Sequence, residues 1–96
     1  MTEYVFLNGE YVDITKASLP VRTHAFLYGT AVFEGIRAYW NEDEKQLYAF
    51  RVPEHYERLL RSAKIMYMES PYTVEEYCKI TRDLLAKNNY KEDAYM

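Results

Sequence analysis

The stretch HAFLYGTAVFEGIRAYW gathers aromatic, acidic and basic side chains around two glycines. If its second half is a strand, alternate side chains share one face, which would carry Phe33, Gly35, Arg37 and Tyr39. A glycine inside a strand suggests that something approaches the backbone closely. Such a face could hold a flat apolar ligand with an acidic group. The alternative is a core strand beneath a helix, with Arg37 on its solvated rim, and the residues alone favour this alternative.

Arg58 is the second candidate for binding chemistry. It lies beside the apolar stripe of a predicted helix, where its guanidinium could hold a phosphate group through two parallel hydrogen bonds. The alternative is an ordinary helix surface. Glu54 and Arg58, like Glu57 and Arg61, are four residues apart in the order that favours weak ion pairs along a helix.

The other reactive side chains form no recognisable catalytic or metal-binding set. His24 and His55 lack the spacing of metal ligands, so each is predicted to be a surface or capping residue. Cys78 lies next to an apolar helix stripe and is predicted to be a small core residue. None of the six lysines has the apolar or cationic surroundings that activate a Schiff-base lysine. The glycines fit neither a dinucleotide-binding motif nor a P-loop.

The composition indicates one small globular domain. Of the 96 residues, 49% are hydrophobic and 28% are charged, which is ordinary. Eleven tyrosines are an unusual number, and they suit interfaces and pocket walls. The net charge of −3, with both signs interspersed, argues against a nucleic-acid or membrane-surface partner. A single cysteine and an N-terminus unlike a signal peptide predict a cytoplasmic location.

The first half of the chain is predicted to form two hairpins. Strands at 4–7 and 10–13 flank Asn8-Gly9, a dipeptide typical of tight turns. The prediction then continues with a loop over 14–23, a helical turn over 24–28 closed by Gly29, a strand over 30–39, a polar loop over 41–46 and a returning strand over 47–51.

The second half is predicted to form two helices. From Pro53 the apolar residues recur at steps of three and four, and after Ser70-Pro71 the same period returns behind a capping box of Thr73 and Glu76. Asn88-Asn89 ends the second helix. The order predicts an α+β domain, in which an antiparallel sheet built from the two hairpins is covered by the two helices.

Two longer motifs resemble the amino-terminal part of branched-chain amino-acid aminotransferases, which are class IV (fold type IV) pyridoxal-phosphate enzymes. They are HAFLYGTAVFEGIRAY and LYAFRVPEHYERLLRSAKIMYM, and the similarity runs from FLNGEYV to KNNYKEDAYM. D-amino-acid transaminases and aminodeoxychorismate lyases share the hairpin and the arginine on the helix. Thr30-Ala31 together with Phe33-Glu34-Gly35 is more similar to the branched-chain enzymes.

The resemblance implies a role for several residues. Arg58 corresponds to the arginine that binds the phosphate of pyridoxal 5'-phosphate. The positions that resemble those lining or supporting the substrate pocket are Tyr28, Phe33, Gly35, Arg37 and Tyr95. With the resemblance, the opening stretch is interpreted as a pocket wall.

Family enzymes are much longer, and their second domain carries the Schiff-base lysine. Residues 1–96 are therefore expected to be the amino-terminal small domain, with no catalytic residue and no metal site, and to be inactive alone. The complete enzyme is expected to transfer the amino group between Leu, Ile or Val and 2-oxoglutarate. Amino acids and 2-oxo acids would be its small-molecule partners, and it is expected to be a homo-oligomer. A stand-alone binding or interaction domain is the alternative.

Overall fold

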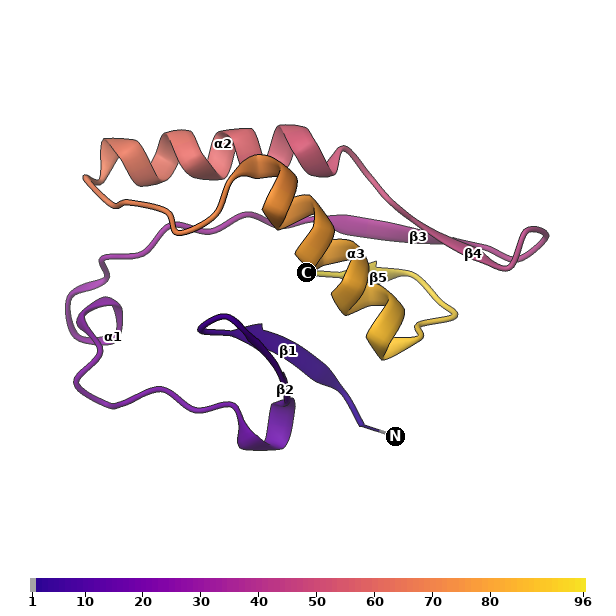
Figure 1. The fold of residues 1–96 in the computed structure, drawn as a ribbon, viewed down its shortest axis with the longest axis horizontal. Coiled ribbons are helices and arrows are strands. Elements are labelled where there is room, and N and C mark those ends of the chain that lie inside the picture. Colours follow the sequence, from indigo (N-terminus) through magenta and orange to yellow (C-terminus); the bar gives the residue numbers. More distant parts are fainter. Residues whose placement is uncertain (1) are drawn as a thin grey trace.

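The structure, a computed structural model, describes residues 2–96 and shows a mixed α and β fold (Figure 1). It confirms the α+β prediction, with a difference in how the strands are grouped. Strands β1 (Tyr4–Leu7) and β2 (Glu10–Asp13) form one antiparallel sheet. Strands β4 (Gln46–Ala49), β3 (Arg37–Asn41) and β5 (Ala94–Tyr95) form a second sheet, in that order.

The first hairpin is as predicted. Leu7 pairs with Glu10 across the two-residue turn, and Asn8 and Gly9 both have positive φ angles, of 51° and 88°. These are the backbone angles that a tight hairpin turn requires. After β2 the chain forms a short 3₁₀ helix, η1 (Ile14–Lys16), then a loop, then the predicted helical turn α1 (His24–Tyr28). Gly29, with φ 70°, ends that turn.

The expectation of a single sheet was wrong: the two hairpins form separate sheets, and at the free edge of β1 the backbone groups of Tyr4 pair with a side chain. Asn88 accepts a hydrogen bond from the Tyr4 backbone N–H at 2.7 Å and donates one to the Tyr4 carbonyl at 2.9 Å. The amide of Asn88 thus takes the place of a neighbouring strand. The paired backbone groups of Tyr4 are therefore not available to a strand of the second hairpin.

The two predicted helices are present, and they pack against each other. Helix α2 (Val52–Ile65) begins after Arg51, and helix α3 (Val74–Asn88) begins with the predicted capping box of Thr73 and Glu76. Between them the rings of Tyr56 and Tyr77 stack with centroids 4.8 Å apart. The Tyr56 hydroxyl lies 2.6 Å from the buried hydroxyl of Thr81.

The predicted strand over 30–39 is shorter than expected. Strand β3 starts only at Arg37, and residues 30–36 have no assigned strand. The reason lies in its partner: β4 ends at Ala49, and Arg51 adopts a left-handed conformation, with φ 54°, that turns the chain into α2. The residues before Arg37 therefore have no β4 partner, and the predicted strand over 47–51 is likewise cut short.

The tail forms strand β5, which the residue pattern alone did not predict, although the family resemblance places Tyr95 at the end of a strand. In β5, Tyr95 lies opposite Arg37, and Met96 exchanges two backbone hydrogen bonds with Ile36, both at 2.8 Å. This pairing places the end of the described chain directly beside the start of β3.

Candidate functional site

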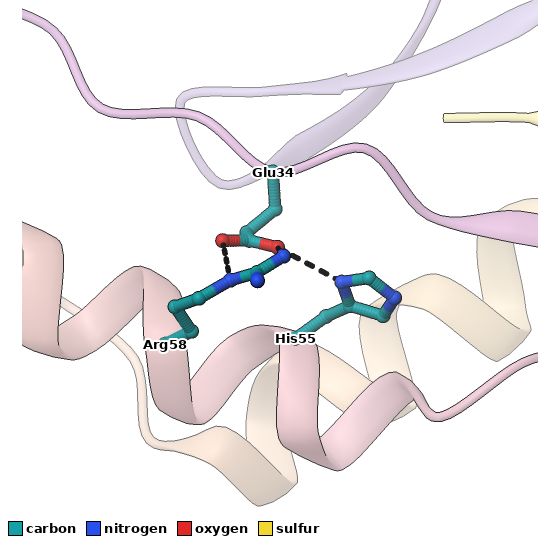
Figure 2. Close-up of polar contacts among 3 residues, drawn as sticks. All are labelled: Glu34, His55 and Arg58. Carbon is teal, nitrogen blue, oxygen red and sulfur yellow. Dashed lines mark hydrogen bonds and ion pairs between the residues drawn. The ribbon is translucent and has the colours of Figure 1, made fainter.

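Arg58 belongs to a polar cluster between α2 and the segment that leads into β3, with the carboxylate of Glu34 at its centre (Figure 2). Its Nε and Nη2 donate to the two carboxylate oxygens of Glu34, at 2.7 and 2.6 Å. The Nδ1 atom of His55 lies 2.8 Å from the same carboxylate. His55 and Arg58 are three residues apart on α2, so both side chains leave the helix on the side that faces Glu34.

This cluster corrects two predictions. Arg58 pairs with Glu34 from a distant segment rather than with Glu54, whose carboxylate lies 3.7 Å from Arg51. His55 is neither a cap nor a fully exposed residue, because its side chain is only 20% exposed and contacts Glu34. Arg58 therefore does not form an ordinary ion pair along the helix surface. It joins α2 to the segment that contains Glu34.

The charges of the cluster are strongly coupled. The hydrogen bonds from Arg58, and then the one from His55, lower the pKa of Glu34 from 4.5 to about 2, although burial opposes the shift. The same contact raises the pKa of the Arg58 guanidinium. Glu34 is thus a permanent anion near neutral pH, and Arg58 is a permanent cation.

Arg58 still has hydrogen-bonding capacity toward solvent. A guanidinium has five N–H groups, and Glu34 uses one on Nε and one on Nη2. The Arg58 side chain is 61% exposed, whereas that of Glu34 is only 8% exposed. The edge formed by Nη1 and the second Nη2 hydrogen is therefore available, and this edge has the geometry that phosphate or carboxylate groups bind.

Three of the predicted pocket residues come together at the end of the second sheet. Arg37 and Tyr95 are opposite each other in β3 and β5, and the guanidinium of Arg37 lies 5.6 Å from the centre of the Tyr95 ring. The Tyr95 ring also covers Gly35: a Cβ atom on Gly35 would lie 2.1 Å from the Tyr95 hydroxyl. Gly35 is needed here because only a residue without a side chain lets the ring lie so close.

The other two predicted pocket residues lie apart from this group. Tyr28 is 70% exposed and packs against the ring of His24, with centroids 4.6 Å apart, while Phe33 is 85% exposed. The exposed side of the second sheet continues the aromatic surface. We call it the outer sheet face, and it consists of Arg37, Tyr39, Tyr48, Phe50 and Tyr95.

Glu34 and His55 were not singled out as site residues from the sequence. A signal was present, because Glu34 alternates with Val32, Ile36 and Ala38 on the otherwise apolar face of the predicted strand. A charged residue on an apolar face requires a partner when it is buried. His55 and Arg58, three residues apart on one side of the predicted helix, were candidates for that partner.

A separate groove lies between the β3–β4 hairpin and α3. Its volume is about 940 Å³, and its apolar lining includes Trp40, Leu47, Val52 and Leu85. Cys78 also lines it, and burial raises the pKa of this thiol. None of the predicted site residues lines the groove, so it is not the candidate site. Within residues 2–96, no group of three or more His, Cys, Asp or Glu side chains could hold a metal ion, and no helix could cross a membrane.

The comparisons with known proteins give the chain its family. The model of the family described as amino-transferase class IV matches residues 31–96. The chain belongs to this family. A probable branched-chain-amino-acid aminotransferase of Aquifex aeolicus is 47% identical to this class IV aminotransferase chain over 98% of it, and a D-alanine aminotransferase of Staphylococcus haemolyticus is 40% identical over 88%.

Solved structures agree with this class IV assignment. The branched-chain aminotransferase of Thermoproteus uzoniensis with norvaline matches 99% of the chain, with a TM-score of 0.92 and 46% identity. The branched-chain amino acid aminotransferase of Thermobaculum terrenum in its PLP-form matches 98%, with a TM-score of 0.88 and 36% identity. The chain corresponds to 31% of each of those two structures, and it spans about 30% of the length of the curated relatives it matches.

Proposed function

We propose that this chain is the amino-terminal small domain of a pyridoxal-phosphate-dependent branched-chain aminotransferase. The reaction would move the amino group between L-leucine, L-isoleucine or L-valine and 2-oxoglutarate. The observation that carries this proposal is the similarity to the Thermoproteus uzoniensis enzyme, whose structure contains norvaline, over 99% of the chain. Because the match covers only a part of the relatives, the activity belongs to the complete protein.

The cofactor's phosphate fits the free edge of Arg58. That edge is exposed, is held by a buried carboxylate behind it, and carries a permanent positive charge. A phosphate group binds such an edge through two charge-assisted hydrogen bonds. Pyridoxal phosphate, when bound, supplies the electron sink that amino-group transfer requires. Here the chain's own contribution is to anchor the phosphate and to orient the bound molecule.

The proposed substrate wall consists of Gly35, Arg37 and Tyr95, with Tyr28 and Phe33 as outlying members. The bare backbone at Gly35 lets the Tyr95 ring form a flat apolar surface, and Arg37 lies beside it as a cation for a carboxylate. An apolar wall of this kind separates side chains that differ by one methylene by only about 1–3 kcal/mol. We therefore expect leucine, isoleucine and valine all to be accepted.

The lysine that carries the cofactor is proposed to lie outside residues 1–96. All six lysine side chains of this chain are exposed, whereas a Schiff-base lysine is activated by an apolar pocket or a neighbouring cation. We further propose that the complete enzyme is a cytoplasmic homo-oligomer. The eleven tyrosines suit subunit interfaces, and the single cysteine fits a reducing compartment.

A D-amino-acid transaminase is the second candidate. The D-alanine aminotransferase of Staphylococcus haemolyticus is 40% identical to the chain, and the branched-chain relatives of Rickettsia bellii and Aquifex aeolicus are 39% and 47% identical. The two candidates use the same cofactor anchor and differ in the handedness of the amino acid that the pocket accepts.

The test uses the protein expressed from the complete open reading frame that encodes this chain. Amino-group transfer to 2-oxoglutarate is measured with L-leucine, L-isoleucine, L-valine and D-alanine. Turnover of the three L-amino acids and little with D-alanine supports the proposal, while the reverse supports the second candidate. Transfer with none of them contradicts both.

A variant of Arg58 tests the cofactor anchor. Arg58→Ala is expected to weaken the affinity for pyridoxal phosphate roughly ten- to hundredfold, because a charge-assisted bidentate contact is lost. The affinity is measured by absorbance titration. Arg61→Ala, another exposed arginine of α2, is the matched control and should leave it unchanged. Equal affinity for both variants would remove Arg58 from the proposed site.

A further inference from the structure

Glu34 presents an apparent conflict with the proposed function, on which the following inference rests. A buried carboxylate lies in direct contact with the arginine that is proposed to bind a phosphate. By charge alone, an anion in that place repels the phosphate and weakens its binding. The placement is therefore useful only if Glu34 contributes something that outweighs the repulsion.

The geometry of the contact shows what that contribution is. An arginine side chain has several freely rotating bonds, and fixing them on ligand binding carries an entropic cost. Glu34 meets both Nε and Nη2, and a two-point contact fixes the plane of the guanidinium as well as its position. The planar group then presents its Nη1 edge in one direction before any ligand arrives.

His55 holds the carboxylate in turn. Its Nδ1 lies 2.8 Å from Oε1 of Glu34, the same oxygen that accepts from Arg58 Nη2. The imidazole is mostly buried and comes from the same helix as Arg58, so the three side chains join α2 to the segment before β3 (Figure 2). Glu34 also lies next to Gly35, which underlies the Tyr95 ring. The cluster thus links the proposed phosphate anchor to the proposed substrate wall.

We infer that Glu34 and His55 are positioning residues that preorganise Arg58 to bind the phosphate of the cofactor. Neither touches the phosphate. Glu34 orients the guanidinium so that its Nη1 edge faces outward, and His55 fixes the rotamer of Glu34.

The two explanations predict opposite changes in the affinity for phosphate. Removing the negative charge in Glu34→Gln should strengthen phosphate binding if the effect is electrostatic repulsion alone, and should weaken it if Glu34 positions Arg58. We expect the affinity for pyridoxal phosphate to fall about three- to tenfold. Binding is measured by absorbance titration of the protein expressed from the complete open reading frame. Pyridoxal, which lacks the phosphate, is the second probe, and its affinity should not change.

Control variants separate positioning from other effects. Glu57→Gln removes the same charge from an exposed position beside Arg58 on α2 and should not weaken phosphate binding. His55→Ala should weaken phosphate binding by less than Glu34→Gln does. His55→Asn should bind the phosphate nearly as well as the unaltered protein, because the asparagine amide can replace the Nδ1 donor. Where Glu34→Gln does not fold, Glu34→Asp keeps the charge and tests the geometry alone.

A double variant decides whether Glu34 acts through Arg58. If it does, Glu34→Gln combined with Arg58→Ala binds pyridoxal phosphate no more weakly than Arg58→Ala alone. Unchanged or tighter binding by Glu34→Gln, or additive losses in the double variant, would overturn the inference while leaving the proposed function intact. Failure of Arg58→Ala to weaken binding would instead overturn the proposed anchor itself.

Discussion

Helix α3 and the outer sheet face differ in how far the described residues bury and pair their side chains. The buried polar groups of α3 are paired. Toward β1, Asn88 bonds to both backbone groups of Tyr4, and it also bonds to the Leu84 carbonyl. Toward α2, Thr81 bonds to the Tyr56 hydroxyl, and within α3 to the Tyr77 carbonyl. Within residues 2–96, no buried side-chain nitrogen or oxygen is left without a partner. This side of the domain is complete.

The outer sheet face is the opposite case. Tyr39, Tyr48, Phe50 and Tyr95 expose between 46% and 68% of their surface, although aromatic residues of this size stabilise a protein mainly through burial. The buried apolar residues are only Ile36, Ala38 and Ala63 among those described. The comparison indicates that the buried polar groups on the helical side find their partners within the domain. The aromatic residues on the sheet side need another surface to bury them. The following predictions test each half of that comparison.

The largest expected effect is on the helical side, at Asn88. Asn88→Ala removes three hydrogen bonds and leaves the edge of β1 unpaired. We expect the free energy of unfolding to fall by about 2–3 kcal/mol, because unsatisfied buried backbone groups are costly. Urea unfolding of the chain measures it. Asn88→Asp keeps the acceptor for the Tyr4 N–H but places a carboxylate oxygen against the Tyr4 and Leu84 carbonyls, so its loss should be at least as large. A loss below about 0.5 kcal/mol for Asn88→Ala would contradict the interpretation that pairing of buried polar groups stabilises the helical side.

The next effect concerns association through the outer sheet face. The 96-residue chain is expected to self-associate, and Phe50→Lys should weaken this association about ten- to hundredfold, as expected from losing one buried aromatic side chain and adding a charge. Light scattering over a concentration series measures it. Phe26→Lys, which changes a phenylalanine in α1 that is more exposed than Phe50, is the control and should have little effect. A constant monomer mass up to high micromolar concentration would refute the prediction.

A smaller effect is expected at Thr81. Thr81→Val preserves the volume but removes the partner of the Tyr56 hydroxyl, and should lower the free energy of unfolding by about 1 kcal/mol. Tyr56→Phe in the same background removes the stranded hydroxyl and should recover part of the loss. Urea unfolding of the two single variants and the double variant tests this. Fully additive losses would show that the hydroxyl pair does not matter.

The smallest effect is a dependence on pH at Glu34. Because the pKa of Glu34 is lowered to about 2 in the folded chain, from 4.5, folding favours its charged form. The resulting stabilisation is present above about pH 4.5 and is lost as the pH falls toward 2. Unfolding midpoints measured between those values should therefore decline less in Glu34→Gln than in the unaltered chain. Parallel declines would show that Glu34 is not held by Arg58 and His55.

Local chemistry made much of the fold predictable. The Asn8-Gly9 turn and the capping box of Thr73 and Glu76 depend on neighbouring residues alone, and both are present as predicted. The single sheet and the strand over 30–39 depended instead on distant partners. The side chain of Asn88 closes β1, and the turn at Arg51 removes the partner that would have extended β3. Neither interaction leaves a periodic signal in the sequence.

The candidate site also contains residues that the sequence could identify and residues that it could not. Arg58, Arg37 and Tyr95 could be singled out from a resemblance to known motifs, and the structure places the last two together. The partners that hold Arg58 could not be found in this way, since Glu34 and His55 are separated by a hairpin and meet only when α2 folds back. The roles of all these residues toward cofactor and substrate stay predictions until the variants are measured.

The bond between Asn88 and Tyr4 also sets the order of events during synthesis. The two residues are 84 positions apart, so at about 5–20 residues per second the edge of β1 waits about 4–17 seconds for its partner. During that time the hairpin is a short two-stranded unit with open backbone groups, and such units are marginal in water. A nascent chain of this kind therefore depends on late, long-range closure, and any variant that delays α3 lengthens the interval in which the first strand can pair with the wrong neighbour.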